Sequence, residues 1–169
     1  MNSFGCNPVL WCAQGKGDVS TMKWLQGKKC DLTLINNNRH GVLHKAAQRG
    51  QQDICAWFFE NLVSQCASES ALKLVGPDTE GYCPSDLAGI EGNEKLARFL
   101  AKNEMTLVQD LMLNQEKNRN NLPVNWPDWL HKSRNGISMR LSEKEQHTWE
   151  RYGGIRRMMF SLTSVSKKG

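Results

Sequence analysis

Several features that would assign a chemistry to this sequence are absent from it. No apolar run approaches the roughly 18 residues that a membrane-spanning helix requires, so we expect no membrane span. No basic segment precedes the short apolar run at the N-terminus, which argues against a signal peptide. The GxSxG motif, the HExxH motif and the Walker phosphate loop are also missing. We therefore predict a protein that is not an enzyme and that uses no cofactor.

Cysteine pairing is another missing feature. The six cysteines form no CxxC motif and are scattered over the first half of the chain, at positions 6, 12, 30, 55, 66 and 83. Isolated cysteines beside alanine and aliphatic residues usually behave as small buried hydrophobic side chains. No Asn-x-Ser/Thr acceptor for glycosylation occurs either. We interpret the cysteines as reduced thiols and expect an intracellular protein, either cytoplasmic or nuclear.

Positive charge is present but unevenly distributed. The net charge of the chain is +5. Residues 1–118 contain 12 basic and 13 acidic side chains, whereas residues 119–169 contain 10 basic and 4 acidic ones. The basic character therefore belongs to the C-terminal third, which we treat as a separate region.

Three similar segments align with one another over residues 2–103. Each begins with Asn or Asp in a polar turn, continues with a short stretch containing alanine and then a glycine, and ends in an amphipathic stretch. The first residues of the segments are Asn2, Asn36 and Asp78, and their glycines are Gly17, Gly50 and Gly92. Self-similarity of this kind is typical of a repeat array.

Each segment has the composition of a helix–turn–helix unit. Asn or Asp opens a turn because its side chain bonds the nearby backbone. Glycine ends the first helix because it adopts a positive φ without strain from a Cβ atom. Ile54, Trp57 and Phe58 fall on one apolar face of the second helix in the middle segment. Trp24 and Phe99 hold the position of Trp57 in the other two segments, and we predict that all three lie in the core.

The three segments resemble the ankyrin-repeat family, whose pattern is a turn followed by T-P-L-H-x-A-A and a glycine. The second segment matches it with Gly41-Val42-Leu43-His44-Lys45-Ala46-Ala47 and Gly50. The other two match it with Asn7-Pro8-Val9-Leu10 and with Cys83-Pro84-Ser85-Asp86-Leu87-Ala88. The resemblance implies an all-α solenoid of helix–turn–helix units, with repeats near residues 2–35, 36–77 and 78–103.

The sequence departs from the family pattern in several places. About nine residues are inserted after the second repeat, around VSQCASESALKLVG, where they either extend its second helix or form a finger. Gly41 stands where the family has the threonine that bonds the histidine. Trp11 and Trp24 lie in the first repeat, where no preceding helix covers them, so we expect that the chain is a fragment or that a partner covers this end. Residues 104–118 are typical of one more helix, which we predict to cap an array domain spanning residues 1–118.

Two histidines four residues apart suggest a metal site. His40 falls in a predicted turn and His44 at the start of a helix, so we expect neither a shared face nor a bound metal. The resemblance implies that His44 is structural and bonds between neighbouring turns. We therefore assign His44 to the frame of the repeat and His40 to an exposed turn tip.

The resemblance also implies a function, because ankyrin arrays bind other proteins through their turn tips and first helices. Carried over position by position, the turn tips are Ser3, Phe4, Cys6, Asn37, Asn38, His40, Thr79, Glu80 and Tyr82. The first helices add Gln48, Arg49, Ile90 and Glu91. Of these we predict a scaffold contact through Phe4, Asn37, Asn38, His40, Gln48, Arg49, Glu80, Tyr82, Ile90 and Glu91. The sequence does not identify the partner protein.

The C-terminal extension, residues 119–169, leaves an alternative function open. Two prolines and four asparagines in NRNNLPVNWPDWL exclude a helix there, so we expect an irregular segment. The extension mixes basic side chains with tryptophans, which can bind a nucleic acid or an acidic surface. The residues that would make this contact are Arg134, Arg140, Arg151, Arg156 and Arg157. A third hypothesis is that the chain is an accessory domain of a larger protein.

Overall fold

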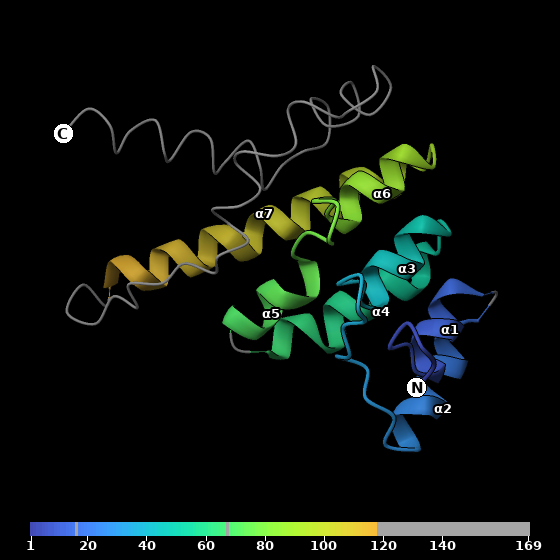
Figure 1. Ribbon diagram of the computed structural model, residues 1–169. Helices are drawn as coiled ribbons and strands as arrows, with labels where there is room; N and C mark the ends of the chain where they lie inside the picture. The colour runs from blue at the N-terminus through green and yellow to red at the C-terminus, as the bar shows by residue number, and fades with distance from the viewer. Residues whose placement is uncertain (16, 67, 118–169) are drawn as a thin grey trace.

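The computed structural model describes residues 1–15, 17–66 and 68–117, and every regular element in these ranges is helical (Figure 1). The predicted all-α class is confirmed. The elements are α1 (Pro8–Gln14), α2 (Val19–Gly27), α3 (Val42–Gln48), α4 (Gln52–Asn61), a 3-10 turn η1 (Val63–Gln65), α5 (Ser68–Val75), α6 (Pro84–Ile90) and α7 (Glu94–Lys117).

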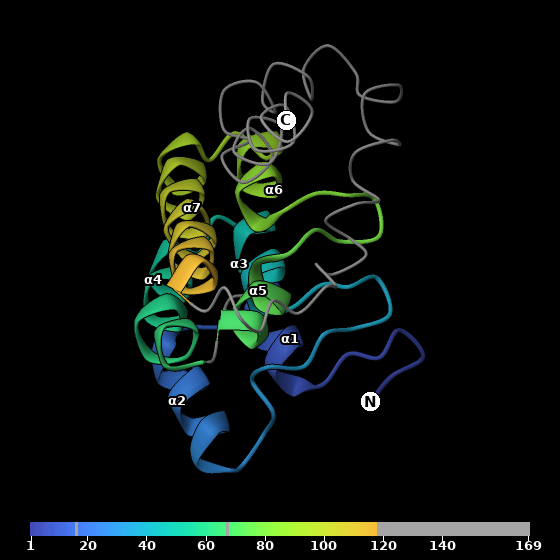
Figure 2. The same cartoon turned by 90° about the vertical axis from the view of Figure 1, so that its left-hand side faces the viewer.

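The helices form three pairs that stack in chain order. The pair α1 and α2 lies at one end, α3 and α4 lie in the middle, and α6 and α7 lie at the other end (Figure 1). Each first helix begins 34 or 42 residues after the previous one. The turns that precede the first helices project from one side of the stack (Figure 2). Three successive helix pairs therefore share one continuous hydrophobic core.

Local chemistry sets the ends of the short helices. Asn7 caps α1 by accepting the N–H of Leu10 at 3.0 Å, and Asp18 caps α2 by accepting the N–H of Thr21 at 2.8 Å. Gly50 follows α3 with φ of 68°, and Gly92 follows α6 with φ of 79°. Both glycines end the first helix of their repeat, as predicted. The prediction for Gly17 was wrong, because α1 ends before it, at Gln14, and Gly17 has no positive φ.

The insertion after the second repeat forms an additional helix. Neither predicted form is present, because α4 ends at Asn61 and η1 leads into the separate helix α5. Ala71, Leu74 and Val75 of α5 are buried in the common core, and α5 packs against α7 and α3. Burial of this apolar face explains why the insertion folds back onto the array.

Helix α7 spans 24 residues without interruption. The prediction of a separate capping helix over residues 104–118 was wrong, because residues 94–117 continue directly from the third repeat into that region. Within the described ranges, no helix combines the length and the hydropathy needed to cross a membrane.

The aromatic position shared by the second helices is covered to different degrees. Trp57 is 8% exposed and Phe99 is partly buried. Trp24 is 61% exposed, so its predicted place in the core was wrong. The physical reason is its place in the first repeat, on whose outer side no helix pair of the described residues lies (Figure 1).

All six cysteines are free thiols, as predicted. Cys55 is completely buried between the second helices, and burial raises the pKa of its thiol to about 12. Such a thiol stays protonated and acts as a small apolar side chain.

Candidate binding surface

The three turns share one hydrogen-bonded design. In each turn the Oδ1 atom of the opening Asn or Asp accepts two backbone N–H groups, two and four residues later, at 2.9 to 3.1 Å. The opening residues are Asn2, Asn36 and Asp78, as the sequence predicted. The backbone then reverses through a residue with a positive φ, which is Gly5, Arg39 or Gly81.

A ladder of contacts links each turn to the next. The N–H of Asn37 donates to the carbonyl of Phe4, and the N–H of Thr79 donates to the carbonyl of Asn38, both at 3.1 Å. Side chains add a second set of contacts, from Asn36 Nδ2 to Cys6 Sγ at 3.3 Å and between His40 and Asp78. These contacts hold the turn tips in a fixed row (Figure 2).

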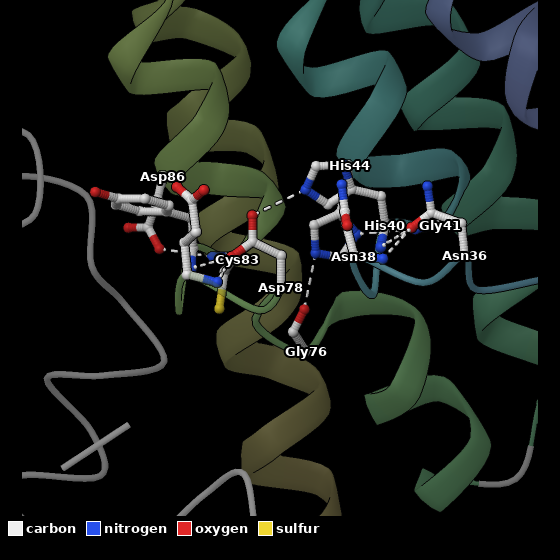
Figure 3. Close-up of polar contacts among 11 residues, drawn as sticks. Asn36, Asn38, His40, Gly41, His44, Gly76, Asp78, Cys83 and Asp86 are labelled. Carbon is white, nitrogen blue, oxygen red and sulfur yellow. Dashed lines mark hydrogen bonds and ion pairs between the residues drawn. The ribbon is translucent and has the colours of Figure 1, made fainter. Parts of the chain in front are cut away.

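His40, His44 and Asp78 form a buried polar cluster between the second and third repeats (Figure 3). His40 Nε2 lies 2.9 Å from Asp78 Oδ2, and the two histidine rings stack with centroids 5.4 Å apart. The Gly41 N–H donates to His44 Nδ1 at 3.3 Å, so the proton of this ring lies on Nε2, which donates to the Gly76 carbonyl at 2.9 Å.

The structural role predicted for His44 is therefore present, although its usual threonine partner is replaced. The backbone N–H of Gly41 takes the place of a threonine hydroxyl. Burial and the neighbouring His40 lower the pKa of His44 to about 3. Burial alone would raise the pKa of Asp78, but hydrogen bonds from His40 and the Tyr82 N–H outweigh it and lower that pKa.

The prediction that His40 lies at an exposed turn tip was wrong, because its side chain is only 11% exposed. His40 precedes α3 and so shares no helical face with His44, as predicted, but the two rings stack directly. The physical reason is the carboxylate of Asp78, which lies 38 residues away in sequence and gives the imidazole a buried partner. Cys6, which holds the same position in the first turn, is buried too.

The other predicted contact residues lie at or near the surface. The exposed ones are Ser3, Phe4, Asn37, Asn38, Arg49, Thr79, Glu80 and Glu91. Those that are partly buried are Gln48, Tyr82 and Ile90. Phe4 is 62% exposed, and the Arg49 Nε atom donates to the Gln14 carbonyl of the preceding repeat at 3.0 Å. The structure thus places one group along the turn row and the other on the first helices beside it.

Glu104 is an important residue that sequence analysis missed. It lies on α7, is fully buried, and accepts hydrogen bonds from the N–H and the hydroxyl of Ser85 in α6. Its carboxylate thereby caps the first helix of the last repeat from the neighbouring helix. Its sequence signal is its spacing, because it follows Leu96 and Leu100 at intervals of four residues, on the apolar side of the helix.

Two further points of the sequence analysis concern metal binding and the basic extension. In the part of the chain that the structure describes, no three His, Cys, Asp or Glu side chains are grouped so as to hold a metal ion. The basic residues of the extension, Arg134, Arg140, Arg151, Arg156 and Arg157, lie outside the described residues.

Comparison with known proteins agrees with the helix pairs and the turn row. No curated protein matches the chain. The family model described as ankyrin repeats matches residues 9–121 in three copies, which is more than half of the chain. The matched range includes the three stacked helix pairs. The chain therefore belongs to the ankyrin-repeat family.

Proposed function

We propose that this chain is a non-enzymatic scaffold that binds another protein across its turn tips and the adjacent first-helix surface. Ankyrin repeats are in general protein-interaction modules. One observation supports the proposal for these particular residues: the opening Asn or Asp of each turn is engaged in hydrogen bonds with the backbone of its own turn, whereas Phe4, Asn37, Asn38 and Glu80, which lie between the frame residues, are exposed. Such a row offers exposed side chains on a rigid backbone.

The chemistry of the display positions defines the kind of partner. Phe4 is a large exposed apolar side chain at one end of the row. Asn37 and Asn38 offer amide groups in the middle, and Glu80 adds a negative charge at the last turn. Arg49, which directly follows α3 as its C-cap residue, adds a cation beside the row. The surface therefore suits an extended partner segment with an apolar anchor, polar groups and at least one basic residue.

A variant of the proposed contact residues, called the display variant, and a matched control variant test the proposal. The display variant replaces Phe4, Arg49 and Glu80 by alanine. The control replaces Glu60 and Lys95, which are exposed on second helices, so that it also removes one cation and one carboxylate. Affinity capture with quantitative mass spectrometry should find partners that the parent chain and the control retain and that the display variant loses. Partners retained equally by all three proteins, with unchanged helical circular dichroism, would contradict the assignment.

A second candidate function rests on the composition of residues 119–169. Ten basic and four acidic residues occur there together with tryptophans. We infer, as the second candidate, that residues 119–169 bind a nucleic acid or an acidic surface. Binding to oligo-dT should then weaken steeply as salt rises, and it should disappear when residues 119–169 are removed. Salt-independent binding, or binding that survives the deletion, would exclude this function.

A further inference from the structure

Three basic residues of the second repeat form a set of cations that no described carboxylate pairs with. Arg39 lies in the turn before α3, Lys45 lies in α3, and Arg49 directly follows that helix as its C-cap residue. The ion pairs within the described ranges involve other side chains. We call Arg39, Lys45 and Arg49 the cationic column.

The cationic column is a property of the second repeat alone. The turn, the fourth helical residue and the C-cap residue of the first and third repeats are all without positive charge. These equivalent residues are Gly5, Trp11 and Gly15 in the first repeat, and Gly81, Leu87 and Glu91 in the third. The helix pairs therefore stack without a cation at these three positions, and the column needs an explanation other than the fold.

Arg39 adopts a backbone conformation that favours glycine. Its φ is 61°, and the equivalent residues of the other two turns are both glycines, with φ of 76° and 92°. A Cβ atom makes this left-handed region unfavourable. The guanidinium of Arg39 donates no hydrogen bond to a described residue. The chain thus keeps an arginine at a backbone cost and without a structural contact for its charge, which is typical of a functional position.

Lys45 is a covered cation without a counter-charge. The residue is 8% exposed, and its ammonium group donates no hydrogen bond within the described part of the chain. The nitrogen itself is not fully buried, so the charge reaches the surface at the end of a covered stem. Burial lowers the pKa of Lys45 and Arg49 lowers it further, whereas Cys6 and Asp78 raise it. Because Cys6 and Asp78 belong to the first and third turns, Lys45 lies between the turn row and Arg49.

Arg49 completes the column about one helical turn beyond Lys45. Residues four apart along a helix are neighbours on its surface. The Arg49 Nε atom donates to the Gln14 carbonyl of the preceding repeat at 3.0 Å, and the residue is exposed. This hydrogen bond orients the guanidinium, whose terminal nitrogens donate to no described residue. An oriented planar guanidinium beside a second cation suits a carboxylate.

Charge indicates what occupies the cationic column. Residues 119–169 contain ten basic and four acidic side chains, so the extension of this chain is a poor occupant. Two copies of the chain repel one another, since each has a net charge of +5. Glu80 and Glu91 are exposed on the adjacent third repeat, where they repel a continuous polyanion such as a nucleic acid. A protein segment with a localised acidic side chain avoids all three conflicts.

We propose, on the basis of the binding surface proposed above, that the cationic column binds an acidic side chain of the partner segment. The same segment places a basic side chain over the third repeat, beside Glu80 and Glu91. Helices α3 and α6 pack against each other, and the axes of packed helices lie about 8 to 10 Å apart. An extended chain covers that distance in about three residues. The acidic and basic residues of the partner are therefore expected about three positions apart.

Selection from a displayed library of random linear peptides tests the proposal. The baits are the full chain, the column variant Arg39→Gly with Lys45→Met, and the control variant Lys23→Met with Lys95→Met. The control removes two cations that are exposed on second helices, and the column variant leaves Arg49 in place. The full chain and the control should select peptides with Asp or Glu at one position and Lys or Arg about three positions away. The column variant should bind these peptides about tenfold or more weakly in fluorescence anisotropy.

Thermal melting separates this role in binding from a role in folding. Glycine accommodates the positive φ at position 39, and methionine fills the covered site at position 45 without burying a charge. The column variant should therefore melt at no lower temperature than the full chain while its affinity falls. If the double variant does melt lower, Arg39→Gly alone should still weaken peptide binding at an unchanged melting temperature.

Several results would overturn the proposal. Peptides selected without an acidic preference, or bound equally by the column variant, would remove the acidic contact while leaving the proposed binding surface intact. Failure to select any peptide would contradict both the acidic contact and the proposed function. Binding of oligo-dT that the column variant loses would show that the column takes phosphate. Dimers in sedimentation experiments that the full chain forms and the column variant does not would show that a second copy is the occupant.

Discussion

The buried imidazole of His44 makes the stability of the array depend on pH in a calculable way. Its Nδ1 atom accepts the Gly41 N–H and its Nε2 atom donates to the Gly76 carbonyl, so the folded state holds the neutral ring. The pKa of His44 falls from 6.5 to about 3 on folding, with burial as the main cause. The unfolded chain therefore binds one proton more than the folded chain between these two values.

The sign and size of the pH effect on the free energy of unfolding follow from this difference in bound protons. The free energy of unfolding is highest above pH 6.5 and decreases as the pH falls from 6.5 towards 3. At pH 5 the unfolded His44 is almost fully protonated and the folded one is not, which lowers the stability by about 2 kcal/mol relative to pH 7.5. This figure depends only on the unfolded pKa, because the folded ring stays neutral at pH 5. The lowered pKa of Asp78 reduces stability only in more acidic solution, below about pH 4.

Urea unfolding at pH 7.5 and pH 5, at constant ionic strength, measures this effect. The comparison protein is His44→Gln, whose amide keeps one acceptor and one donor but does not titrate. The variant should be less stable than the parent at pH 7.5, and the gap between the two should shrink by about 2 kcal/mol at pH 5. A gap that stays constant between the two pH values would refute the reasoning, since it would mean that His44 binds protons equally in both states.

Three further outcomes are expected from the described contacts. Glu104→Ala should lower the free energy of unfolding by about 2 to 3 kcal/mol, because the Ser85 donors lose their buried acceptor, and Glu104→Gln should recover part of the loss in urea melts. Gly50→Ala should cost about 1 to 2 kcal/mol in thermal melts, since φ is positive there and a Cβ would lie 2.8 Å from the Asn93 side chain, whereas Gly27→Ala meets no atom within 4 Å and should be neutral. Cys55 should resist iodoacetamide in the native protein at pH 8 and react after unfolding in urea, as peptide mass spectrometry would reveal.

The regular parts of the fold could be predicted because each depends on a local signal. Each turn is opened by an Asn or Asp that contacts residues two and four positions later, at Asn2, Asn36 and Asp78. Such contacts depend only on residues that are close in sequence, so the sequence can predict them. Gly50 and Gly92 end helices by a property of glycine alone. The uninterrupted helix α7 was not predicted, although neither glycine nor proline occurs between Gly92 and Pro123 to divide it.

The features that sequence analysis missed depend on distant partners. The burial of His40 requires Asp78, and the burial of Glu104 requires Ser85, 19 residues earlier in another helix. A histidine in a turn and a glutamate in a helix are ordinary surface residues until a partner removes them from water. Trp24 shows the opposite case, since its spacing is that of a core residue and only the absence of a covering helix pair in the structure exposes it.

One physical requirement connects the three divergent family motifs. The first helix of each repeat has N–H groups at its start that no carbonyl of the helix accepts, and a reciprocal pair of side chains, known as a capping box, can satisfy two of them. Here the three repeats use different side chains of that arrangement. Asn7 uses its own side chain to accept the N–H of Leu10, three residues later, whereas the side chains of His44 and Asp86 accept N–H groups three residues earlier. Because capping requires an acceptor at either end of this four-residue span, a leucine or an aspartate can replace the family's histidine while the helix start stays satisfied.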